Sequence, residues 1–171
     1  TMAQHLAGDY EDDAEARGFN EFTTQGLANV AWAYARQAQL AEESDVTIYA
    51  DIGEDLLYRL FSRIADAFVR DLNGSGMATP QHISNTAWAF AVLGLKHGTF
   101  LEALKRFVMQ ITRSSAKGKT PLNTFSGQEL ANFLWALASL NTPPEAIVDM
   151  ALIILQSLFE KTLDNVPAHE I

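Results

Sequence analysis

Three side-chain types recur together in this chain and could bind a ligand by stacking and hydrogen bonding. A Trp is preceded three residues earlier by an Asn and seven residues earlier by a Gln, and the set occurs three times. Positions i, i+4 and i+7 lie on one side of an α-helix, so each set would share a helical face. Such a face could contact single-stranded bases, one repeat at a time. The sets are Gln25, Asn29 and Trp32; Gln81, Asn85 and Trp88; and Gln128, Asn132 and Trp135.

The same residues also have a structural interpretation, which we expect to hold. Each Trp is followed by an Ala, and a Trp beside small residues is typical of close helix packing. A buried amide without a partner costs about 1 to 3 kcal/mol, so the Asn side chains are expected to bridge backbone groups between repeats. Positions that differ between the sets are then the better candidates for selectivity. These are Gly26, His82 and Glu129, and Arg36, Val92 and Ser139.

Charge is distributed unevenly along a chain whose net charge is −9. Residues 1–55 hold twelve Asp or Glu side chains against Arg17 and Arg36, whereas residues 96–119 hold six basic side chains against Glu102 alone. A local basic strip can contact phosphates in an acidic chain, because charges act within about 10 Å at ordinary salt. The candidate phosphate contacts are Lys96, Lys105, Arg106, Arg113, Lys117 and Lys119.

Patterns that would indicate other chemistry are missing from the sequence. The chain has no Cys, and its four His residues have no partner at a metal-ligand spacing. Neither a Ser nucleophile motif nor a phosphate-binding Gly loop is found. We therefore expect no enzymatic activity, no cofactor and no metal. No apolar run is long enough to cross a bilayer, so no membrane insertion is expected.

Helices must position the recurring side chains, and each set begins with the same start signal. Thr23, Thr79 and Ser126 are natural N-caps, because a hydroxyl can accept a hydrogen bond from the free amides of the first helical turn. From each cap an apolar stripe of helical period follows. In the first set this stripe is Leu27, Val30, Ala31, Tyr34 and Ala35.

A second apolar helix follows each first one, which predicts an all-α fold. Stacked helical hairpins of this kind form a solenoid, here a right-handed α-solenoid of three hairpins plus a short N-terminal helical remnant. The segments 37–52 and 113–124 are expected to be loops that could contact partners. The expected boundaries are 1–22 for the remnant and acidic tether, and 23–171 for the repeat domain, with hairpins at 23–74, 79–118 and 126–164.

The motif Gln-x-Leu-Ala-Asn-x-x-Trp-Ala-x-Ala resembles the first-helix signature of octotricopeptide repeats and of the related repeats in RAP-domain and FAST-kinase-like proteins. The resemblance covers about residues 23–163. It implies an α-solenoid of plastids or mitochondria that binds organellar transcripts. By this resemblance the framework positions are Asn29, Trp32, Asn85, Trp88, Asn132 and Trp135.

Taken with the residues, the resemblance leads us to expect a non-enzymatic module that binds single-stranded RNA in organellar gene expression, in a soluble, reducing compartment. We expect it to be part of a longer chain or larger complex. The alternative is an acidic scaffold that holds a protein partner on its concave face, or a structural subunit of a larger organellar assembly. A structural segment of a longer catalytic protein is a third interpretation. Solenoids serve all of these roles, so the fold alone does not choose between them.

Overall fold

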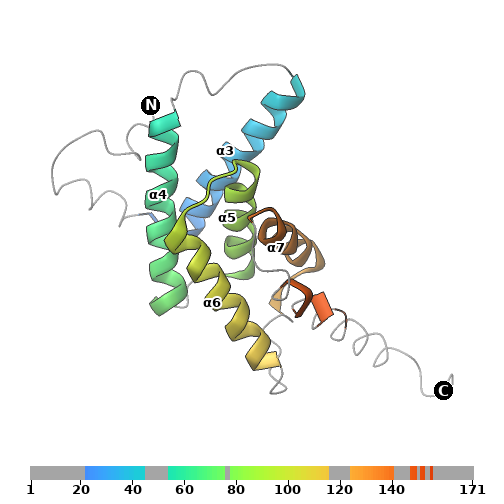
Figure 1. The fold of residues 1–171 in the computed structure, drawn as a ribbon. Helices are drawn as coiled ribbons and strands as arrows, with labels where there is room; N and C mark the ends of the chain where they lie inside the picture. Colours follow the sequence, from blue (N-terminus) through green and yellow to red (C-terminus); the bar gives the residue numbers. More distant parts are fainter. Residues whose placement is uncertain are drawn as a thin grey trace.

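The computed structural model describes residues 22–44, 54–75, 78–115, 124–140, 147–149, 151–152 and 155. Nearly all of these residues are helical and none of them forms a strand, which confirms the all-α expectation. Figure 1 shows the arrangement. The elements are α3 (Thr24–Ser44), α4 (Glu54–Arg70), the π-helical turn η2 (Asp71–Ser75), α5 (Pro80–Val92), α6 (Gly98–Ser115) and α7 (Gly127–Ser139).

The first helix of each repeat begins where its cap residue predicts. Thr79 and Ser126 have extended backbone and accept hydrogen bonds from the amides of His82 and Glu129, both at 3.3 Å. Thr23 does the same for Gly26, with Oγ1 and the amide nitrogen 3.1 Å apart. These bonds satisfy donors that have no partner within the helix. The three predicted caps are therefore confirmed.

The three first helices form one layer, in which α3 packs along α5 and α5 packs along α7 (Figure 1). Small side chains make this close approach possible, because an Ala leaves room for the neighbouring backbone. The buried alanines of this layer include Ala31 and Ala35 of α3, Ala87 and Ala89 of α5, and Ala136 of α7. The apolar stripe predicted for α3 is confirmed, with Val30 and Tyr34 half-buried at its margin.

The second helices α4 and α6 pack against each other and form the other layer (Figure 1). Four buried Phe side chains join the layers. Phe90 of α5 lies edge-on to Phe61 of α4, with ring centroids 5.2 Å apart, and stacks on Phe100 of α6 at 4.2 Å. Phe100 also meets the edge of Phe68 at 5.8 Å. Aromatic pairs of this geometry stabilise a core by about 0.5 to 1.5 kcal/mol beyond the area they bury.

A tight turn after α5 lets the chain reverse into α6. Gly94 has φ +63°, a left-handed conformation that glycine adopts without strain. The amide of Leu95 donates to the carbonyl of Phe90 at 2.9 Å, and the amide of Gly94 donates to that of Ala91 at 3.1 Å. This pair of bonds is a Schellman motif, which ends a helix by satisfying its last carbonyls. It joins the two layers through residues 93–97 only.

Polar contacts fix the ends of helices that are distant in sequence. Thr24 at the start of α3 donates a hydrogen bond to the carboxylate of Asp71 at the start of η2. Ser62 of α4 is 2.9 Å from Nε2 of His97, whose Nδ1 is 3.1 Å from Thr99. Helix α4 ends at Arg70, and the chain continues from it through the wide turn η2 to Ser75.

Two segments expected to be loops are partly helical. Helix α3 extends to Ser44, so residues 37–44 of the segment 37–52 are helical, and α6 extends to Ser115. Both helices continue because no proline or helix-ending glycine stands at the predicted boundary. Residues 1–21 lie outside the described residues, and so does most of the second helix predicted for the hairpin 126–164. Ile147 of that hairpin is described and packs against the core.

Candidate nucleic-acid interface

The recurring Gln, Asn and Trp side chains lie on the outer side of the first-helix layer. At 100° per residue, Trp32 is about 140° around α3 from the buried Leu27. Gln25, Asn29 and Arg36 follow the i, i+4, i+7, i+11 spacing with Trp32 and share its face. On α3 the core lies on the opposite side of the helix, whereas on α5 the equivalent Trp88 and Val92 are half-buried and pack against the core. We name these four positions in each first helix the amide–indole stripe.

The expectation that the tryptophans are buried is wrong for two of them. Trp32 is 45% exposed and Trp135 is 49% exposed, although Trp88 between them is half-buried and packs against the core. The buried side of each first helix is the one that carries Leu27, Ile83 or Leu130. The Trp lies five residues further along, about 140° around the helix, and so points away from that side. Of the alanines that follow the tryptophans, Ala89 and Ala136 are buried and Ala33 is exposed.

The expected amide ladder is also absent from the described part of the chain. No hydrogen bond to the side chain of Asn29, Asn85 or Asn132 is formed by any described residue, and Asn29 is exposed. Because these amides are not buried, water satisfies them and no bridging partner is required. Each therefore keeps two donors and an acceptor available to a ligand.

Packing of the first helices places the three stripes side by side. Helix α5 lies between α3 and α7 (Figure 1). Because the stripes occupy equivalent positions of the three helices, the stripe with Trp88 comes between those with Trp32 and Trp135. Helices pack at about 8 to 10 Å, which sets the spacing of the rows. None of the twelve stripe positions is an Asp or Glu. An acidic chain thus presents one face without carboxylates at its repeated positions.

The last position of each stripe differs between repeats. Arg36, Val92 and Ser139 each lie four residues after the Trp, one helical turn further on. Arg36 and Ser139 are exposed and Val92 is half-buried. Arg36 Nη1 donates to Gln39 Oε1 at 2.7 Å, which holds the guanidinium on the surface of α3.

The other varying positions have a local role in the helix start. Nδ1 of His82 accepts from the amide of Thr79 at 3.3 Å, and Glu129 Oε2 accepts from the amide of Ser126 at 2.6 Å, so each completes a capping box. Gly26 has no side chain to do this. Burial lowers the pKa of His82, opposed by the nearby Asp71 carboxylate, and so favours the neutral form whose Nδ1 can accept.

The structure describes four of the six basic side chains predicted as phosphate contacts. Lys96 is exposed in the turn after α5, and Lys105 pairs with Glu102 at 2.6 Å. That hydrogen bond and the lysine charge lower the pKa of the Glu102 carboxyl. Lys117 and Lys119 lie outside the described residues.

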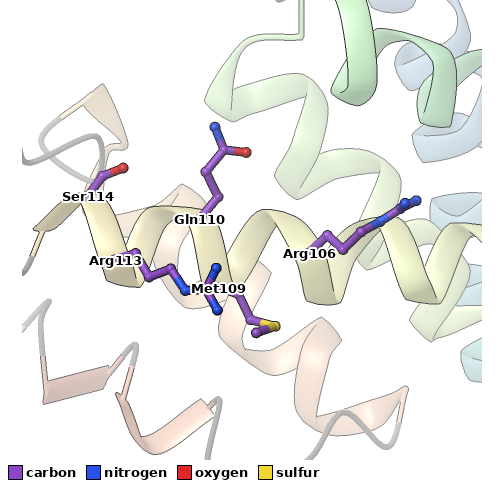
Figure 2. A pocket seen from close by; sticks show the side chains of 5 residues that line it. All are labelled: Arg106, Met109, Gln110, Arg113 and Ser114. Carbon is purple, nitrogen blue, oxygen red and sulfur yellow. The ribbon is translucent and has the colours of Figure 1, made fainter.

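Arg106 and Arg113 line a shallow groove of about 400 Å³ along α6, with Met109, Gln110 and Ser114 (Figure 2). Arg113 and Met109 extend on one side of the helix, and Gln110 and Ser114 on the other. Both arginines lie about 180 to 200° around α6 from the buried Leu104, so they face away from the core. The groove and the amide–indole stripe are therefore on opposite faces of the two-layer structure.

Sequence reasoning missed further basic side chains on the second-helix layer. Arg59 and Arg70 of α4 are exposed, and Arg63 is half-buried. They were overlooked because Asp66 and Asp71 balance them in a charge count along the chain. A helical projection would have separated them from the apolar face of α4 and grouped them.

Other kinds of site were sought among the described residues. They contain no group of three or more His, Cys, Asp or Glu side chains placed to hold a metal ion. None of their helices combines the length and the hydropathy that spanning a membrane would take.

A comparison with known proteins bears on the origin of the repeats. A chloroplastic RAP domain-containing protein of Oryza sativa subsp. japonica is 29% identical to this chain over 130 residues, which is 75% of the chain. The similarity supports a RAP-like relationship. The chain spans 16% of the length of that RAP domain-containing protein. No protein-family model matches the chain, and no solved structure matches it significantly.

Proposed function

We propose that this chain is a non-enzymatic helical-repeat module that binds single-stranded RNA through the amide–indole stripes of α3, α5 and α7. The observation that carries the proposal is the exposure of Trp32 and Trp135 at equivalent positions of two repeats. Half of a large apolar ring in contact with water is unfavourable unless a ligand covers it. Trp88 occupies the matching position between them.

The chemistry of the stripe suits unpaired bases. Every base has a π-face that can stack on an indole, and such stacking contributes about 1 to 3 kcal/mol per base. The Asn and Gln amides beside each indole offer donors and acceptors that match base edges. Duplexes hide both the faces and most of the edges of their bases, so a single strand is the better ligand.

Charge on the rest of the surface limits how the strand is held. The stripe contributes one cation, Arg36, so a short RNA would be bound mainly by stacking and hydrogen bonds. Arg106 and Arg113 lie on the opposite face, about 20 Å away through two helix diameters. They would contact the phosphates only of a strand long enough to pass around the edge of the layers.

The RAP domain-containing relative supports the cellular setting of the proposal. That protein is chloroplastic, and the chain's first-helix motif resembles repeats of organellar RNA-binding proteins. We therefore place the module in organellar gene expression, with the plastid as its compartment.

Fluorescence anisotropy with a labelled random pool of short single-stranded RNA tests the proposal. The W32A/W135A variant should bind at least tenfold more weakly than the wild type, given the stacking energy of two bases. Y58A is the matched control, because Tyr58 is 52% exposed on α4, away from the stripes. Thermal unfolding followed by circular dichroism checks that each variant folds.

Equal affinity of W32A/W135A and the wild type would remove the stripes from the binding surface. If the wild type binds no RNA at near-physiological salt, the proposal fails, and the exposed indoles are then better explained as a docking face for a protein partner. Tryptophan is enriched at such interfaces.

A further inference from the structure

The amide–indole stripes are identical in three of their four positions and differ only in the fourth. Gln, Asn and Trp recur in every repeat, whereas the last position is Arg36, Val92 or Ser139. The shared side chains offer the same chemical groups in each repeat, so they cannot give one repeat a hydrogen-bonding preference that another lacks. Any base preference that differs between repeats must therefore come from the fourth position.

The fourth position is placed to reach the edge of a base that stacks on the indole. Residues four apart on a helix are neighbours, with Cβ atoms about 5 to 6 Å from each other. Arg36 lies one turn beyond Trp32 on the same exposed face, and its guanidinium is held at the surface by the hydrogen bond from Nη1 to Gln39 Oε1. A base lying on the Trp32 ring would present its edge to the guanidinium.

We infer that Arg36 makes the first repeat selective for guanine. This inference rests on the proposed function, because it assumes that a base stacks on Trp32. The guanidinium presents parallel N–H groups that match the O6 and N7 acceptors of guanine, a pairing that no other base offers. The hydrogen bond from Nη1 to Gln39 Oε1, at 2.7 Å, fixes one side of the guanidinium and reduces the freedom lost on binding.

The other two repeats lack a comparable group. Val92 has no polar atom to read a base edge, and the Ser139 hydroxyl can donate to or accept from any base. The stripe of α3 is therefore selective for one base, whereas the stripes of α5 and α7 accept any base. This asymmetry sets the register of a bound strand that contains one guanine.

Anisotropy titrations of the full chain against a labelled uridine tract, unmodified or with one central guanine or adenine, test the inference. The wild type should favour the guanine-containing tract over the other two by about 5- to 150-fold, the range for a good bidentate pair. R36A should lose this preference, so that it binds the three tracts with equal affinity. R36K should lose most of it, because lysine has no planar fork. S139R is the matched gain-of-function variant, because Ser139 is exposed one turn beyond the exposed Trp135, and it should favour a tract with two guanines.

Each other result has a distinct meaning. If R36A retains the guanine preference, another residue reads the base and the inference is wrong. If R36A weakens all three tracts equally and lowers the salt dependence, Arg36 contacts a phosphate instead. If the wild type binds all tracts but without preference, selectivity is absent while the proposed function stands. If it binds none of them, the proposed function fails and the inference fails with it.

Discussion

Replacing Thr86 by Val should stabilise the protein. Thr86 of α5 is 0% exposed, and its Oγ1 is the one buried side-chain nitrogen or oxygen among the described residues that has no hydrogen-bond partner. The equivalent positions of the neighbouring first helices are apolar, Val30 in α3 and Phe133 in α7. The substitution keeps the branched shape of the side chain and exchanges the hydroxyl for a methyl group.

The magnitude follows from the cost of the unpaired hydroxyl. A buried polar group without a partner costs about 1 to 3 kcal/mol, and the helix propensities of Thr and Val are similar. We expect the free energy of unfolding of T86V to rise by about 1 to 2 kcal/mol. For a chain of this size that corresponds to a rise in Tm of about 2 to 8 °C.

Urea denaturation followed by circular dichroism measures this difference directly. S84A is the matched control, because Ser84 is as deeply buried in the same helix but donates a hydrogen bond to the carbonyl of Pro80 at 2.8 Å. Its hydroxyl is satisfied, so S84A should bring no gain. A T86V variant that is no more stable than the wild type, or a gain in S84A of equal size, would refute the reasoning.

Three further predictions concern a cap, the core and the basic groove. Because burial lowers the pKa of His82 in the folded state, the unfolded chain takes up a proton first as the pH falls below about 6.5, and stability present at pH 7 is lost toward pH 5. H82Q keeps an acceptor for the Thr79 amide, so between pH 7 and pH 5 it should lose less free energy of unfolding than the wild type in paired urea titrations. An equal loss in both proteins would show that His82 is not the group responsible. F90A should lower the free energy of unfolding by about 3 to 5 kcal/mol in urea, because Phe90 joins the two layers, and a loss below 1 kcal/mol would show that it does not. R106A/R113A should leave the affinity for a short RNA unchanged. In anisotropy titrations the variant should bind a longer strand more weakly, and its affinity for that strand should depend less on salt. Equal weakening of both lengths would place the short RNA on α6.

The sequence was sufficient for the local structure of each repeat. Hydroxyl caps at Thr79 and Ser126 and the apolar stripe from Leu27 depend on neighbours a few residues away, so they can be read from spacing alone. The spacing of Gln, Asn and Trp likewise determined that they share a helical face. The turn at Gly94 is likewise local, because a glycine soon after the last apolar residues of α5 can adopt the left-handed conformation that ends a helix.

Tertiary structure alone decided which faces meet water. The first helices are apolar on more than one side, because alanines surround each indole, so periodicity could not tell whether Trp32 would face the second layer or solvent. The second layer covers the side of Leu27 and Ala31, and this single choice of packing left Trp32 and Trp135 exposed and the Asn amides without a partner. The sequence also could not tell whether the basic side chains and the amide–indole stripes share one surface. The arginines of α6 belong to the second layer and the stripes to the first, so the two sets face in opposite directions. Periodicity fixes the angle between side chains on one helix, whereas the contact between helices fixes which of those angles is covered.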